Sequence, residues 1–180
     1  MKRRMQQMIC LATCFLAGVV LYGAVASAYA RTAPTSEAAI KSGYVFNFIK
    51  FVEWPSAQDG QMFNVCLLGS DPFANALDSL NGKAVRGRPI RVVEDVSLAH
   101  TRYCHVVFVS RSESGRLTNA LLRLRQAPIL TISDIAGFAD KGGVIELMTS
   151  PSGEIGFRVS KKSADDVGLR VSSKLLSLSR

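Results

Sequence analysis

SEAAIKSGYVFNFIKFVEWP, residues 36–55, is the stretch around which the rest of the chain is organised. Its start predicts a helix, because Thr35 or Ser36 can cap the free N–H groups of the first turn and an acidic residue follows. Pro55 disfavours helical geometry at Trp54, so we expect the helix to stop there. Four apolar residues recur at every fourth position and predict one buried face: Ile40, Tyr44, Phe48 and Val52.

This aromatic helix has two interpretations. In the first, it is a core helix packed on a sheet. In the second, its far side, with Phe46, Phe51 and Trp54, contacts another protein, because the segment carries more aromatic side chains than a narrow stripe can bury.

The first thirty residues have the pattern of an export signal. A basic start (residues 2–4) precedes an apolar run (residues 8–26), and Ala28-Tyr29-Ala30 matches a signal-peptidase site. We therefore expect residues 1–30 to be a signal peptide that is cleaved after Ala30, which leaves residues 31–180 as one α/β domain. An uncleaved membrane anchor is the alternative, because the apolar run is long enough to span a bilayer.

The charge of the chain is moderate. The full sequence has 22 Lys and Arg against 14 Asp and Glu, a formal net charge of +8. Removal of the basic leader leaves a mildly basic domain with dispersed charge. This predicts weak attraction to anionic lipid headgroups or acidic partners, and it carries no signature of nucleic-acid binding.

Two cysteines remain beyond the leader, Cys66 and Cys104. A pair of cysteines in an exported protein predicts one disulfide. Closing a loop of that length would stabilise the fold by roughly 4 kcal/mol in the chain-entropy model. Two free, buried thiols are the alternative.

The apolar runs predict the fold class. Nearly continuous apolar segments at residues 63–68, 104–109 and 129–132 indicate strands that are buried on both faces. Helical patterns alternate with them, which predicts a three-layer α/β fold with a mostly parallel sheet and helices on both faces. Residues 144–148 and 155–159 then predict an antiparallel C-terminal hairpin. A short helix from residue 161 and a closing amphipathic segment, residues 169–178, complete the chain.

Catalytic motifs are missing from the sequence. His100 and His105 are the only histidines, no serine lies in a Gly-x-Ser-x-Gly turn, and no phosphate-binding loop is present. No spacing suggests a zinc site. We therefore expect no enzyme, no catalytic residue, no cofactor and no metal.

Polar residues follow the predicted strands at their carboxyl ends, where parallel sheets bind ligands. These residues could hold a small polar molecule, or they could only cap the helices that follow: Ser70, Asp71, Ser110 and Asp134.

An ordered set of segments resembles the YfiR-like family of exported bacterial proteins. The segments are KSGYVFNFIKFVEWP (41–55), FNVCLLGSDPF (63–73), GKAVRGRPIRV (82–92), CHVVFVSRSE (104–113), ILTISDIAGFADKGGVIEL (129–147), GFRVS (156–160) and GLRVSSKLLSLSR (168–180). The resemblance implies a periplasmic α/β domain that restrains an inner-membrane diguanylate cyclase through its periplasmic portion. It thereby implies lower cyclic di-GMP signalling and less biofilm formation.

The resemblance also bears on partners and cysteines. In some systems of the family an outer-membrane lipoprotein sequesters the repressor, and the family would place a disulfide at Cys66 and Cys104. For the contact with the cyclase we expect apolar contributions from Phe48, Phe51 and Trp54. The expected polar contributions come from Arg170 and Lys174.

Two alternatives to this function stay open. One is a periplasmic solute-binding module that uses the four polar residues at the strand ends. The other is a self-contact of the aromatic helix in a homodimer.

Overall fold

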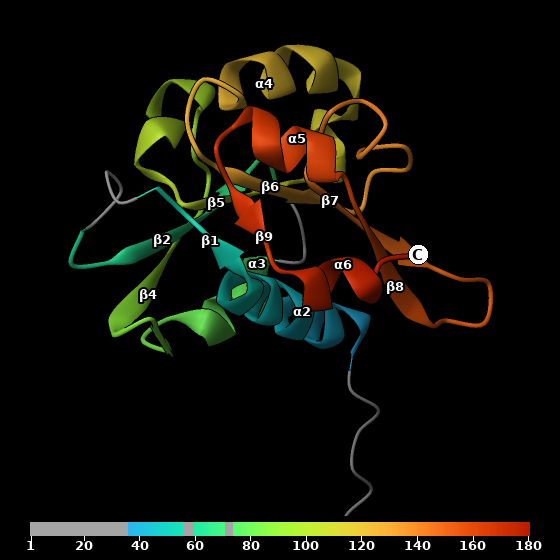
Figure 1. Ribbon diagram of the computed structural model, residues 1–180, viewed down its shortest axis with the longest axis horizontal. Coiled ribbons are helices and arrows are strands. Elements are labelled where there is room, and N and C mark those ends of the chain that lie inside the picture. Colours follow the sequence, from blue (N-terminus) through green and yellow to red (C-terminus); the bar gives the residue numbers. More distant parts are fainter. Residues whose placement is uncertain (1–35, 56–59, 71–73) are drawn as a thin grey trace, which may run out of the picture. The chain divides into compact units, whose positions relative to one another are not determined.

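One mixed sheet of seven strands lies at the centre of the computed structural model, which describes residues 36–55, 60–70 and 74–180 (Figure 1). Five adjacent strands run parallel, and one antiparallel strand pairs with the outer strand at each edge. In spatial order they are β3 (Ala84–Val85), β4 (Arg88–Val93), β2 (Phe63–Leu68), β5 (Val106–Val109), β6 (Leu130–Ser133), β7 (Ile145–Thr149) and β8 (Ile155–Val159). A separate two-stranded ribbon pairs β1 (Val52–Glu53) with β9 (Arg170–Val171).

The order of the parallel strands creates a switch point in the sheet. β2 lies between β4 and β5, and Val65 of β2 is in register with Val92 on one side and Val106 on the other. The chain therefore crosses from β2 to one side to form β4 and then returns to the other side to form β5. Open α/β sheets bind ligands in the crevice that such a reversal leaves at the carboxyl ends of the strands.

Helices cover both faces of the sheet (Figure 1). One core cluster joins the sheet to α2 (Glu37–Phe51), α3 (Ala74–Leu77), the 3-10 helix η2 (Asp78–Leu80), α5 (Lys161–Asp166) and α6 (Ser173–Ser177). The other face carries the 3-10 helices η3 (Leu98–Tyr103) and η4 (Arg111–Arg116) and the helix α4 (Leu117–Leu124).

The side chains of β2 show how the two cores are divided. Val65 and Leu67 belong to the cluster on the α2 face, whereas Cys66 and Leu68 belong to the cluster with Leu121 of α4. Successive strand residues point to opposite faces, so a strand that is apolar throughout is buried on both. The predicted three-layer, mostly parallel fold with its antiparallel C-terminal hairpin is confirmed.

The opening helix begins as predicted and ends earlier. Ser36 is the N-cap, and its Oγ accepts a hydrogen bond of 3.2 Å from the backbone N–H three residues on. The helix stops at Phe51 rather than at Trp54, because Val52 is extended and pairs with Val171 of β9. The prediction placed the end at the proline and missed this pairing.

The buried face of α2 also differs from the predicted one. Ile40 is 39% exposed, so it lies outside the core. Lys41, which follows it, is buried instead, because its ammonium reaches the Asp134 carboxylate at 2.6 Å. The buried residues of the helix are Lys41, Ser42, Val45, Phe48 and Ile49.

The C-terminal segment differs from the predicted amphipathic segment in its first half. Residues 170–171 form β9, and Ser172 then caps α6 by accepting a hydrogen bond of 3.2 Å from the Leu175 N–H. The chain ends against the edge strand β8, where the Arg180 N–H donates to the Phe157 carbonyl at 3.0 Å. The C-terminus thereby covers part of that edge.

The predicted disulfide between Cys66 and Cys104 is present, with Cα atoms 5.9 Å apart. Cys104 lies outside the strand in which the sequence placed it. It ends η3, and β5 begins two residues later. The bond therefore ties the connection before β5 to β2, and both cysteines are buried.

Candidate functional site

Phe48 belongs to the core, so it is not a contact residue for a partner. Its side chain is 1% exposed, and its ring packs between Tyr44 and Phe157 with centroid distances of 5.7 and 4.9 Å. A partner cannot reach it in this fold. The fourfold repeat that marked Phe48 as part of the apolar face was correct, and its assignment to an interface was wrong.

Trp54 makes contacts within the fold and is partly buried. Its Nε1–H donates to the His105 carbonyl at 3.1 Å, and its ring meets Phe63 edge-on with centroids 5.0 Å apart. The His105 ring stacks on Phe63 with ring centroids 4.5 Å apart. Trp54 therefore closes the amino end of β2, and only part of its ring is left for a partner.

Phe51, Arg170 and Lys174 come together on one surface. Phe51 is the last residue of α2 and is half-buried, and the ammonium of Lys174 in α6 lies 5.7 Å from its ring centroid. Arg170 of β9 is in register with Glu53 of β1, and its Nε lies 4.0 Å from the Glu53 carboxylate. The β1–β9 pairing thus joins the end of the first helix to the end of the chain.

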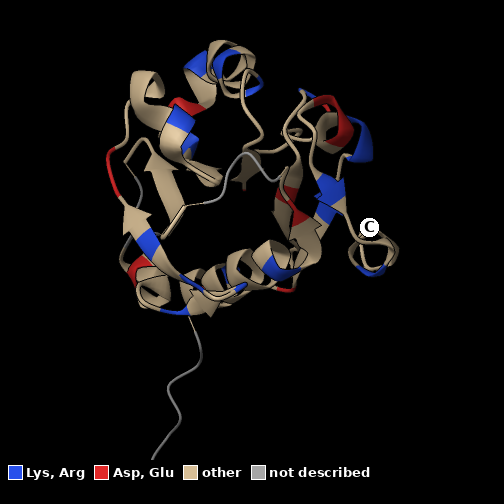
Figure 2. Cartoon of the chain, turned by 60° about the vertical axis from the view of Figure 1, so that its left-hand side comes forward, with Lys and Arg blue, Asp and Glu red and all other residues tan. Residues whose placement is uncertain are grey.

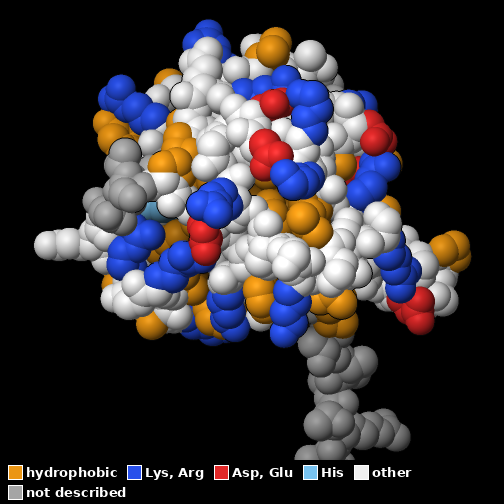
Figure 3. Space-filling model, in the orientation of Figure 1, with side chains coloured by type: hydrophobic (Ala, Val, Ile, Leu, Met, Phe, Trp, Pro, Cys, Tyr) orange, Lys and Arg blue, Asp and Glu red, His pale blue; other side chains and the backbone are white. Residues whose placement is uncertain are grey.

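Basic side chains dominate this area. Lys50 precedes Phe51, and Arg86 donates to the Val52 carbonyl at 2.7 Å from the turn between β3 and β4. Figure 3 shows Lys and Arg intermixed with apolar side chains over α2, α6 and the ribbon, and Figure 2 shows further basic residues on the α4 side. We define the ribbon surface as Lys50, Phe51, Glu53, Arg86, Arg170 and Lys174; most of these residues line a hollow of about 230 Å³.

The structure brings together two of the four residues proposed as ligand contacts. Ser110 Oγ donates to the Ser70 carbonyl at 2.8 Å, and the Ser70 N–H donates to Ser112 Oγ at 3.2 Å. Ser110 also caps η4, so the capping interpretation holds for it. Asp71 lies outside the described residues. Asp134 follows β6 and binds elsewhere.

Asp134 holds α2 to the sheet near the start of the helix. Its Oδ2 binds the Lys41 ammonium at 2.6 Å and the Arg111 guanidinium at 3.1 Å, and Lys41 also pairs with Glu37 at 2.8 Å. Burial lowers the pKa of Lys41, but the bonds to the two carboxylates outweigh this and raise it above its usual range. The other oxygen of Asp134, Oδ1, is buried without a hydrogen-bond partner among the described residues. The sequence analysis did not predict that Lys41 is buried. Residues four apart share one face of a helix, so Lys41 lies on the same face as Val45. A lysine on a buried face indicates an ion pair.

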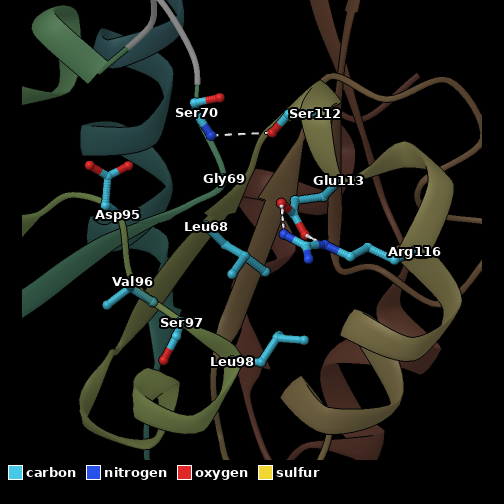
Figure 4. A pocket seen from close by; sticks show the side chains of 10 residues that line it. All are labelled: Leu68, Gly69, Ser70, Asp95, Val96, Ser97, Leu98, Ser112, Glu113 and Arg116. Carbon is cyan, nitrogen blue, oxygen red and sulfur yellow. Dashed lines mark hydrogen bonds and ion pairs between the residues drawn. The ribbon is translucent and has the colours of Figure 1, made fainter.

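A cavity of about 560 Å³ opens at the carboxyl ends of β2, β4 and β5, beside the switch point (Figure 4). Leu68, Val96 and Leu98 form its apolar wall. Gly69 has a φ of +86°, and a Cβ at this position would lie 2.8 Å from the Glu113 carboxylate. A glycine is therefore required where β2 ends against that buried acid.

The charged pair at this cavity is joined by two hydrogen bonds. Glu113 is 1% exposed, and both of its oxygens accept from Arg116: Nε to Oε2 at 2.5 Å and Nη2 to Oε1 at 2.7 Å. These hydrogen bonds raise the pKa of Arg116 above its usual range. The sequence analysis did not identify Glu113, Arg116 or Asp95, because the cavity collects residues from three separate segments.

Both histidines form hydrogen bonds within the fold. His105 Nδ1 accepts from the Asn64 N–H at 3.0 Å, and His100 Nδ1 shares a hydrogen bond of 2.8 Å with Ser97 Oγ. In residues 36–55, 60–70 and 74–180, no three His, Cys, Asp or Glu side chains are grouped so that they could hold a metal ion. None of the helices in these ranges has the length and apolar character needed to cross a membrane.

Comparisons with known proteins identify the family. No curated protein matches the chain. Among solved structures, it is similar to a conserved domain protein from Vibrio cholerae O1 biovar eltor, with a TM-score of 0.50 and 9% identity over 77% of this chain and 58% of that chain. At this identity the likeness concerns the fold alone. The model of the YfiR/HmsC-like family matches residues 38–180, which include all of the described strands and helices except the first residue of α2. The chain therefore belongs to the YfiR/HmsC-like family.

Proposed function

We propose that this chain is an exported regulatory protein that restrains a membrane-bound diguanylate cyclase and so lowers cyclic di-GMP signalling and biofilm formation. The YfiR-like family is associated with the regulation of diguanylate cyclases, which supports the general role. The proposal includes cleavage of the leader after Ala30 and contact with the periplasmic portion of the cyclase. Sequestration by an outer-membrane lipoprotein and a homodimer remain predictions.

The ribbon surface is the observation that carries the proposal. The set combines four basic side chains with Phe51, and Glu53 is the one acid within it. Aromatic and arginine side chains supply much of the binding energy at protein interfaces, and charge complementarity steers association. The surface therefore suits a partner with an acidic patch and an exposed apolar residue.

Restraint requires a difference in affinity between two states of the partner. A ligand that binds both states equally shifts no equilibrium. If the ribbon surface binds the inactive cyclase more tightly by about 3 kcal/mol, the equilibrium shifts more than a hundredfold toward inactivity. Loss of two charged contacts would be enough to remove most of such a difference.

The signalling test uses cells that lack the native copy and express variants of the full chain. We expect Arg170→Ser combined with Lys174→Glu to raise cyclic di-GMP toward the level of the empty strain, because both side chains are solvent-exposed parts of the ribbon surface. Arg123→Glu is the matched control, since Arg123 is exposed on α4 at the other face of the sheet. Immunoblots check that all variants reach the same level.

The result that contradicts the contact is equally clear. If the double variant restrains signalling as well as the original chain, the ribbon surface is not the docking site. A pull-down from solubilised membranes tests the partner itself. Recovery of a diguanylate cyclase supports the proposal, whereas its absence together with unchanged cyclic di-GMP on deletion of the chain rejects it.

A further inference from the structure

The cavity at the switch point offers two opposite charges and an apolar wall, and none of its residues belongs to the ribbon surface. Figure 4 shows Arg116 and Asp95 on opposite sides of the hollow, with Leu68 and Leu98 between them. Small-molecule sites have this composition, with apolar walls and a few convergent polar groups, and volumes of roughly 300–1,000 Å³. The cavity volume of about 560 Å³ falls within that range.

Arg116 has hydrogen-bond donors to spare. A guanidinium carries five N–H groups, and Glu113 takes one from Nε and one from Nη2. The remaining N–H groups, on Nη1 and Nη2, have no partner among the described residues. Because buried Glu113 fixes the plane of the guanidinium, these donors are already oriented for a ligand carboxylate.

Asp95 offers a carboxylate at the opposite side. Among the described residues, none forms an ion pair or a side-chain hydrogen bond with the Asp95 carboxylate. Its backbone has a φ of +50°, and the next residue, Val96, donates its N–H to the Leu67 carbonyl at 3.0 Å. The loop is thereby tied to β2, and the exposed carboxylate is available to a cation.

The sum of the charges selects the ligand. Arg116 and Glu113 cancel each other, so Asp95 gives the described lining of the cavity a net negative charge. A purely anionic ligand is disfavoured there, and a purely cationic ligand leaves the free donors of Arg116 unused. We propose that the cavity binds a small zwitterion with an ammonium and a carboxylate at opposite ends of an apolar body, such as a dipeptide with apolar side chains.

Isothermal titration calorimetry of the purified mature chain tests this proposal with leucyl-leucine as the probe. We expect binding at one site. The N-acetylated and C-amidated dipeptides should each bind at least about tenfold more weakly, because each lacks one charge. Free leucine should also bind more weakly, because its two charges are adjacent and cannot reach both sides of the cavity.

Two variants locate the site. Asp95→Asn keeps the shape of the loop, since asparagine tolerates a positive φ, and Arg116→Lys keeps a cation beside Glu113 but loses the planar fork. Each should weaken dipeptide binding about tenfold, whereas Arg123→Gln on the exposed side of α4 should not.

Three results would overturn the proposal: no heat of binding at dipeptide concentrations of about 10 mM, equal binding of the blocked dipeptides, or unchanged affinity in both folded variants. The comparison of blocked and free dipeptides uses the unaltered protein, so it holds even if a variant fails to fold. The calorimetry is also independent of cyclic di-GMP, and failure of one proposal leaves the other standing.

Discussion

Replacing Lys41 by Met removes the cation that holds the start of α2 to the sheet. Lys41 is 6% exposed, and the Asp134 side chain that it binds is 11% exposed. The substitution leaves an apolar chain of similar length in place, so little packing is lost. It also leaves the Asp134 carboxylate without its closest partner, in a site where one oxygen is already unsatisfied among the described residues.

The expected cost follows from what remains around Asp134. Breaking a buried ion pair from one side costs about 3–5 kcal/mol, because the other charge stays buried. Arg111 still reaches Asp134, but its side chain is 64% exposed, and an exposed pair offsets only about 0–1 kcal/mol. Glu37 is 53% exposed and returns to water easily. We therefore expect Lys41→Met to lower the free energy of unfolding by about 3 kcal/mol.

The double substitution Lys41→Met with Asp134→Asn separates the charge effect from packing. It buries no unpaired charge, so it should cost less than Lys41→Met alone, about 1–2 kcal/mol. Urea unfolding at neutral pH measures both. With a slope of about 2 kcal/mol/M, the single variant should lose roughly 1.5 M in midpoint.

The pH dependence gives a second check on Lys41. A group whose pKa is raised by folding stabilises the fold at every pH below its unfolded value and loses this contribution as the pH rises through the folded value. The contribution of Lys41 should therefore be constant through neutral pH and disappear only in strong alkali.

Two outcomes of the urea experiment would refute the reasoning. One is a loss of under about 1 kcal/mol in the single variant Lys41→Met, and the other is a double variant that loses more than the single variant.

Three further predictions concern the sheet and its connections. Burial raises the pKa of Glu146, but hydrogen bonds from Arg158 and two backbone N–H groups outweigh it and lower the pKa; the stability that Glu146 provides at neutral pH should be lost as the pH falls through that lowered value. The urea midpoint should therefore fall between neutral and acid pH, and this fall should be smaller in Glu146→Gln than in the unaltered chain. Gly69→Ala should lower the free energy of unfolding by about 1–3 kcal/mol, since its φ of +86° and the nearby carboxylate leave no room for a Cβ; an unchanged Tm would contradict this. Reducing the Cys66–Cys104 disulfide should cost roughly 4 kcal/mol and lower the Tm by about 8–16 °C in calorimetry with and without reductant.

The sequence predicted the fold because its strands carry a strong and local signal. Residues 63–68 are apolar on both faces, and only a sheet covered by helices on both sides buries such a run. Alternation with helical segments then favours parallel strands, and the last two apolar runs are joined too closely for anything but a hairpin. Each of these inferences depends on neighbours in sequence.

The errors lie where distant residues decide the structure. Val52 is a strand residue and not a helical one, because it pairs with Val171 of β9. No sequence pattern near residue 52 indicates this partner. Lys41, and not Ile40, lies on the buried face, because its ammonium binds Asp134 at the end of β6. The cavity lies at the strand ends where the sequence analysis expected a ligand, and Ser70 lines it as predicted. Its charged residues were not predicted, because its three segments meet only through the strand order β4–β2–β5.

These long-range contacts also bear on the docking role that we propose for the ribbon surface. The helix α2 is fixed at its start by Lys41 and at its end by the β1–β9 pairing, where the Ser172 N–H donates to the Phe51 carbonyl at 2.9 Å. Phe51 and Arg170 are thus presented on backbone that is already ordered, and a partner need not order it on binding. The anchor and the contact are therefore separable. Loss of Lys41 should act on signalling only through the folded fraction, whereas loss of Arg170 and Lys174 should act at unchanged stability, because both side chains are exposed and their weak contacts contribute little to the fold.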